Sequence, residues 1–236
     1  MPRNLELTPR IEEQRNKNDV QAQIIEFDLN EIKDHFNENI VNIEQNFEIV
    51  DKMISINENE KSKNILRSQI VFLESALDFY LHELSKCGIV KMFNGNWTKT
   101  ERYNNLKVEM KLIDAAINNP ESHDWLLNYI NDKIKREVYI SLDSMKDQLN
   151  LLGIEFENVI NTAYDNKYTL EGNPLNGKQI IKELFTRRNE IAHQSDRNHS
   201  NAEQNDITKE YVLESIDNVK NIVSVIHNIA VSKKND

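Results

Sequence analysis

Glycine and proline are scarce in this sequence, with 5 and 4 copies among 236 residues. Their combined share is about 4%, whereas the two residues together average roughly 12% in proteins. A chain of many strands joined by tight turns needs more turn residues than this, and collagen-like or proline-rich disordered chains need far more. The scarcity therefore favours a helical fold.

Cysteine and long apolar runs are also nearly absent. Cys87 is the one cysteine, which excludes an internal disulfide framework and is typical of a reducing compartment. The first ten residues, MPRNLELTPR, contain no apolar segment. No run of about 18 apolar residues follows them. We therefore expect a cytoplasmic protein that is not attached to a membrane.

Basic residues are fewer than acidic ones. The sequence has 29 Lys and Arg against 39 Asp and Glu, which gives a formal net charge of −10. An acidic balance argues against a protein that coats nucleic acid or anionic membranes non-specifically. It remains compatible with a local basic site. Hydrophobic residues make up 39% of the sequence, which is enough for a sizeable core.

Helical periodicity is the dominant pattern. Two series of apolar residues recur at steps of three and four, which places each series on one face of a helix. The first predicts a helix roughly 45 Å long over residues 25–54. The second predicts a helix over 66–84 that ends at Gly88. The first series is Ile25, Leu29, Ile32, Phe36, Ile40, Ile43, Phe47, Val50 and Ile54, and the second is Leu66, Ile70, Leu73, Leu77, Tyr80 and Leu84.

The rest of the chain also has the pattern of helices separated by loops. The predicted fold is all-α, one elongated helical bundle over residues 21–236, with a charged arm at 1–20. Asn119-Pro120 predicts a break between helices. Further helices are expected at 98–118, 120–130, 141–152 and 179–193, and along the closing series Val212, Ile216, Val219, Val223, Ile226 and Ala230. Loops are expected at 88–97, 165–178 and 195–206.

The most informative stretch is 179–197, QIIKELFTRRNEIAHQSDR. On a helix, Arg188 lies in the middle of an apolar stripe, one turn from both Leu184 and Ala192. An arginine in that position must be paired or must line a cavity, because an unpaired buried charge is very costly. The stripe consists of Ile181, Leu184, Phe185, Ile191 and Ala192.

Two more polar residues of this stretch, Asn189 and His193, lie four residues apart on another face of the helix. A cation, an amide and an imidazole within two turns suit a phosphodiester. Arg can fork onto two phosphate oxygens, and His can transfer a proton near neutral pH. From Lys178 to Arg197 there are five Lys and Arg against three Asp and Glu. The alternative is an Arg-x4-His pair that serves only as a structural salt bridge.

The sequence RRNEIAH, from Arg187 to His193, resembles the signature of the HEPN superfamily: an Arg, a polar residue, and a His after a short spacer. Two further features are similar to its RiboL-PSP-HEPN branch. One is LRSQIVFLESALDFYLHEL at 66–84, which resembles the helix ahead of the motif, and the other is the distance from the motif to the last apolar helix. The resemblance covers about residues 60–232 and leaves out the long N-terminal helix.

This resemblance implies a helical bundle of the HEPN type that forms a homodimer, with the two motifs facing one cleft. It implies a metal-independent endoribonuclease without a cofactor. Arg188 would hold the RNA phosphate, His193 would act as general base or acid, and Asn189 would orient the phosphate or His193. Such domains commonly serve in toxin–antitoxin or phage-defence systems, so an antitoxin or another neutralising protein is an expected partner.

Neighbouring residues have smaller expected roles. We predict that Lys182, Arg187 and Arg197 contact RNA, because they add positive charge around the motif. His199 and Asp196 follow the motif, but their spacing fits no standard set of metal ligands, so no metal site is predicted.

Glu74 and Asp78, one turn apart on the flank of the second helix, are candidates to orient Arg188 or His193. Otherwise they belong to an ordinary half-buried helix face. Two other classes of function also stay open. One is a non-catalytic HEPN module that binds RNA, a nucleotide or a protein, and the other is a purely structural helical protein.

Overall fold

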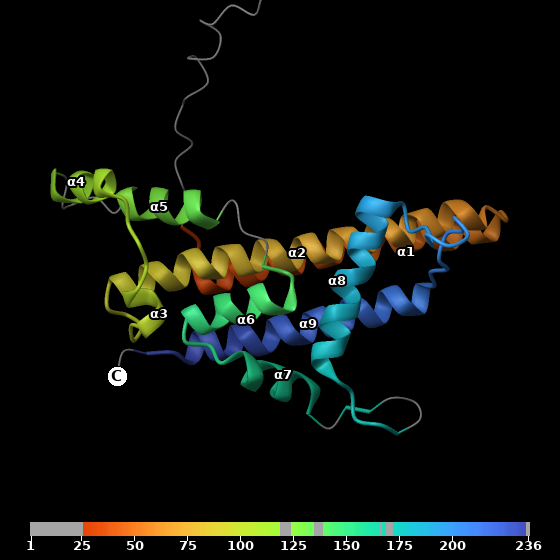
Figure 1. The fold of residues 1–236 in the computed structure, drawn as a ribbon. Coiled ribbons are helices and arrows are strands. Elements are labelled where there is room, and N and C mark those ends of the chain that lie inside the picture. The colour runs from red at the N-terminus through yellow and green to blue at the C-terminus, as the bar shows by residue number, and fades with distance from the viewer. Residues whose placement is uncertain (1–25, 119–123, 135–138, 166, 169–171, 235–236) are drawn as a thin grey trace, which may run out of the picture.

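The computed structural model describes residues 26–118, 124–134, 139–165, 167–168 and 172–234. Within these ranges the chain forms nine α-helices and no β-strand. The elongated all-α bundle with a long N-terminal helix is confirmed (Figure 1). The helices are α1 Leu29–Ser55, α2 Asn59–Phe93, α3 Glu101–Asn104, α4 Met110–Asn118, α5 Asp124–Ile134, α6 Leu142–Leu151, α7 Phe156–Tyr164, α8 Gly177–Gln194 and α9 Lys209–Ser232.

The first helix, α1, begins later than its apolar series predicts. Asp28 is its N-cap and accepts hydrogen bonds from the N–H groups of Asn30 and Glu31, while the Glu31 carboxylate accepts one from the Asp28 N–H. This capping box satisfies N–H groups that a helix start leaves without partners. The predicted arm at 1–20 and the first apolar position, Ile25, lie outside the described residues.

The second helix, α2, passes through Gly88 instead of ending there, so the predicted loop at 88–97 begins only after Phe93. The reason lies in packing, because a Cβ at Gly88 would come within 2.7 Å of both Leu152 and Trp97. Glycine is thus present for a close approach and does not terminate the helix. The turn predicted at Asn94-Gly95 is confirmed, with Gly95 at φ 76°.

The middle of the chain differs from its prediction in two places. The helix expected at 98–118 is split into α3 and α4, and the short helix α7 was not predicted. The helix predicted from Ser141 is confirmed, since the Ser141 side chain caps α6 and Gly153 follows that helix at φ 66°. The break predicted at Asn119-Pro120 lies outside the described residues.

Three long helices, α1, α2 and α9, lie side by side along the bundle, and α8 crosses α2 at a steep angle (Figure 1). The apolar series predicted for α2 and α9 is buried at every position. The crossing brings the C-terminal half of α8 against the middle of α2, which places the Arg188 motif beside Glu74 and Asp78. No helix in the described ranges is long and apolar enough to cross a membrane.

Candidate functional site

The motif from Arg187 to His193 occupies the second half of α8, which ends at Gln194. Two residues of the predicted stripe, Phe185 and Ile191, are half-buried against the core. Ala192 is exposed, so the apolar stripe ends at Ile191, one residue earlier than the sequence predicts.

Arg188 has the carboxylate partner that its position predicts. Its Nε lies 3.6 Å from Oε2 of Glu74, and the side chains are 25% and 2% exposed, respectively. Neither of these two atoms has a hydrogen-bond partner within the described residues. The Nη1 group of Arg188 donates to Oδ1 of Asn189 at 3.0 Å. Asn189 therefore orients Arg188 itself.

The Glu74 carboxyl is perturbed by its surroundings. Burial raises its pKa from the ordinary 4.5 to about 8, against the lowering effect of Arg188 and with a further rise from Asp78. Burial thus works against the charged form of this carboxyl near neutral pH. The less the carboxyl ionises, the less it neutralises Arg188, and the more this cation can attract an anion.

A cavity of about 340 Å³ opens beside Arg188. Asp78 and His82, one turn apart on α2, face this cavity, with His82 Nε2 at 3.5 Å from Asp78 Oδ2. The other carboxylate oxygen of Asp78 accepts a hydrogen bond from the Tyr139 N–H at 2.9 Å. The cavity is lined by Ser75, Asp78, Phe79, His82, Glu83, Ile140 and Arg188.

Sequence reasoning missed His82. Its one signal in the sequence was the spacing of four residues to Asp78, which brings two side chains together on a helix. That spacing is common on solvent-exposed helix faces, and only the crossing of α2 by α8 places the pair at the same cavity as Arg188.

His193 lies elsewhere. It is exposed in the last turn of α8 and is not among the residues that line the Arg188 cavity. Five residues along a helix correspond to about 140° of rotation, so the two side chains leave α8 on different faces. One protomer therefore brings Asn189 to Arg188, but its His193 leaves α8 on a different face from Arg188.

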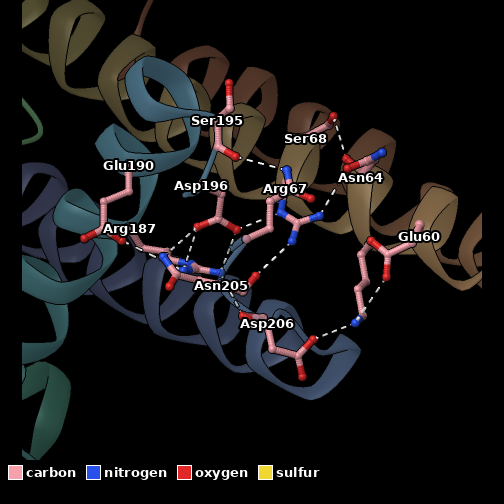
Figure 2. Close-up of polar contacts among 12 residues, drawn as sticks. Glu60, Asn64, Arg67, Ser68, Arg187, Glu190, Ser195, Asp196, Asn205 and Asp206 are labelled. Atoms are coloured by element: carbon pink, nitrogen blue, oxygen red, sulfur yellow. Dashed lines mark hydrogen bonds and ion pairs between the residues drawn. The ribbon is translucent and has the colours of Figure 1, made fainter. Parts of the chain in front are cut away.

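Arg187 has a different environment from its neighbour Arg188. Its guanidinium contacts the Asp196 carboxylate with Nη1 at 2.7 Å and Nη2 at 2.9 Å, and Nη2 also donates to the Asp206 carbonyl. Figure 2 shows Asp196 between this group and a second guanidinium, that of Arg67 on α2. The RNA contact predicted for Arg187 stays a prediction, but its charge is already paired.

The second arginine completes a clamp, by which we mean Arg67, Arg187 and Asp196 together. Arg67 Nε lies 2.7 Å from Asp196 Oδ2, and Asp196 is fully buried. Arg67 Nη2 also donates to the Asn205 carbonyl at 2.8 Å (Figure 2). The loop at 195–206, which its composition predicts correctly, is thus fastened to both α2 and α8.

The two remaining cations of the sequence prediction are at the surface. Lys182 is exposed and lines a groove of about 550 Å³ between α8 and the start of α9, together with Glu190 and Tyr211. Arg197 is exposed in the loop and donates to the Ala202 carbonyl. Cys87 is buried, and burial raises the pKa of its thiol to about 11, so it stays uncharged.

Comparison with known proteins extends the similarity over nearly the whole chain. The family model described as RiboL-PSP-HEPN matches residues 24–232. The match includes α1, which the motif-based resemblance did not reach. No curated protein and no solved structure matches the chain significantly.

Proposed function

Because the chain belongs to the RiboL-PSP-HEPN family, we propose that it is a metal-independent endoribonuclease that cleaves RNA through the 2′-hydroxyl group. The observation that carries this proposal is the environment of Arg188. This half-buried cation is oriented by Asn189, faces a cavity, and lies beside the buried Glu74 carboxyl, whose pKa burial raises to about 8.

In this mechanism the ribose 2′-oxygen attacks the adjacent phosphorus. A base takes the 2′ proton as the new bond forms, and an acid gives a proton to the 5′-oxygen as the old bond breaks. Arg188 holds the phosphate and stabilises the charge that develops on it. His193 transfers one of the two protons, and Asn189 keeps Arg188 in place.

We propose that the active form is a homodimer. Because His193 does not line the cavity of its own protomer, a second copy offers a way to bring a motif imidazole to that cavity. An isologous contact would do this twice, once for each motif. Phe72 and Phe79 are 55% and 38% exposed on α2. In such a contact, these two side chains of one protomer would pack against those of the other and bury their apolar area.

An unrestrained ribonuclease would damage its own cell. We therefore propose a cytoplasmic role as a toxin or phage-defence effector, held inactive by an antitoxin or another neutralising protein. Lys182 and Arg197, which are exposed around the motif, would contact the RNA backbone.

The test is cleavage of total RNA by the purified protein in the presence of EDTA. We expect cleavage with chelator present and products with a 2′,3′-cyclic phosphate and a 5′-hydroxyl. His193→Ala should reduce the rate about 10²–10⁴-fold, and Arg188→Ala should abolish cleavage. The matched control is His199→Ala, which removes an exposed imidazole outside the motif. Cleavage that needs Mg²⁺, or a fully active His193→Ala protein, would refute the mechanism.

A non-catalytic HEPN module that binds RNA is the second candidate. It is favoured by the separation of His193 from the Arg188 cavity within one protomer. On this alternative the wild type binds RNA without cutting it, and Arg188→Ala weakens binding whereas His193→Ala does not.

A further inference from the structure

We propose that His82, which lies beside Asp78, is a second proton-transfer group of the Arg188 cavity. This inference rests on the proposed ribonuclease function and assigns it a residue outside the Arg-Asn-x3-His motif. The motif alone supplies one imidazole for each protomer, whereas cleavage needs both an acid and a base. Within a single chain, the imidazole that shares a cavity with Arg188 is that of His82.

The His82 ring lies between Asp78 and the Tyr139 ring, and its buried Nε2 has no hydrogen-bond partner within the described residues. Its Nε2 lies 3.5 Å from Asp78 Oδ2, and its centroid lies 4.6 Å from the centroid of the Tyr139 ring. Asp78 is itself held, because Oδ1 accepts the Tyr139 N–H. A carboxylate beside an imidazole orients the ring and stabilises the imidazolium ion, which is how an aspartate supports histidine in acid–base catalysis.

The charges around the cavity suit a phosphodiester. The Glu83 carboxylate is balanced by Lys86, whose Nζ lies 2.7 Å away. Burial raises the pKa of the Glu74 carboxyl to about 8, which disfavours a second negative charge near the cavity. With Glu74 uncharged and with His82 in the protonated form that an acid requires, Arg188 and His82 together oppose the single negative charge of Asp78, and one net positive charge is left. A phosphodiester linkage carries one negative charge, so its binding would neutralise the cavity.

Two proton transfers accompany cleavage, and a single imidazole can occupy only one of these roles at a time. When the bond from the 2′-oxygen to phosphorus forms, the first group accepts the 2′ proton. When the bond from phosphorus to the 5′-oxygen breaks, the second group donates a proton to that oxygen. His82 performs one of these two proton transfers and a motif His193 performs the other, while Arg188 holds the phosphate between them.

The first experiment measures single-turnover cleavage of an RNA oligonucleotide by the full chain over a range of pH. Wild type should give a bell-shaped profile, because an acid and a base must both be in the correct form. His82→Gln should lower the rate about 10²–10⁴-fold and flatten one limb of the profile. Added imidazole should partly restore His82→Ala. The matched control is His227→Gln, a half-buried histidine on α9, which should cut like wild type.

The second experiment tests the site without catalysis. Inorganic phosphate is titrated into wild type, Arg188→Ala and His227→Gln proteins while the histidine ring signals are followed by NMR. In wild type and His227→Gln, phosphate should shift the His82 signal, and in Arg188→Ala that shift should be lost. Urea unfolding of each variant checks that the fold is intact.

The outcomes separate the two proposals. A wild type that cuts RNA, together with a His82→Gln protein that folds and cuts equally fast, overturns the role of His82 and leaves the ribonuclease standing. A wild type that never cuts RNA overturns the ribonuclease and with it any proton transfer by His82. A third result also overturns the inference. In it, the His82 variants lose activity that imidazole does not restore, the pH profile of cleavage keeps its shape, and phosphate does not shift the His82 signal of wild type. His82 then only packs against Tyr139.

Discussion

Replacing Glu74 by Gln should change the pH dependence of folding stability in a defined direction. Burial raises the pKa of this carboxyl from 4.5 to about 8. Between these two values the folded protein holds a proton that the unfolded chain has released. Stability of the wild type therefore falls as pH rises through this window, and it stays at the lower level above about pH 8. The amide of the Glu74→Gln variant does not titrate in this range. The stability of the variant therefore should not show this fall as pH rises.

The size of the effect follows from the same values. Each pH unit of difference in pKa corresponds to about 1.4 kcal/mol. A rise from 4.5 to about 8 therefore sets a ceiling of about 5 kcal/mol. Because Glu74 is only 2% exposed, solvent screening takes little from this value. We expect the variant to gain a few kcal/mol relative to wild type between pH 5 and pH 8.

The assay is urea unfolding of both proteins at half-unit steps from pH 5 to pH 9. The difference in unfolding free energy should grow with pH at up to about 1.4 kcal/mol per unit and level off above pH 8. Glu48→Gln, the same change at an exposed position of α1, controls for the loss of one negative charge. A difference that stays constant across this range would show that Glu74 is ionised throughout, and that its carboxylate neutralises Arg188.

Two further predictions concern the clamp and the dimer. Asp196→Asn should lower the unfolding free energy by about 3–5 kcal/mol, because it leaves two nearly buried guanidinium groups without their carboxylate. Glu203→Gln, an exposed change in the same loop, should stay within about 0.5 kcal/mol of wild type in the same urea titration. Wild type should be a dimer by light scattering at micromolar concentration, and Phe72→Ser should shift it toward monomer. A monomeric wild type would contradict the proposed assembly.

The long helices could be predicted because their signal is local. Spacings of three and four residues mark the buried faces of α2 and α9, and each predicted position on them is buried. The pairing of Arg188 was also predictable, since a charge in an apolar stripe needs a partner, and Glu74 was one of two candidates. The first inference uses only neighbours along one helix, and the second adds the cost of burying a charge.

The rest depends on contacts between distant segments, which no local pattern encodes. Gly88 has the sequence signature of a helix end, yet Trp97 and Leu152 pack so closely against it that only glycine fits within a continuing helix. Asp196 lies in a polar stretch and is nevertheless fully buried, because Arg67 reaches it from α2. His82 lies at the same cavity as Arg188 only because α8 crosses its helix.

The clamp has a consequence for the order of events during synthesis. Arg67 and Asp196 are 129 residues apart in the chain. At about 5–20 residues per second, a ribosome needs roughly 6–26 s to make the intervening segment. The hairpin of α1 and α2 can form during that time. Arg67 of α2, however, cannot pair with the Asp196 carboxylate until the loop after α8 has emerged. Arg188 arrives only eight residues before Asp196, so a nascent chain that already has both long N-terminal helices lacks Arg188 for nearly the whole of that interval.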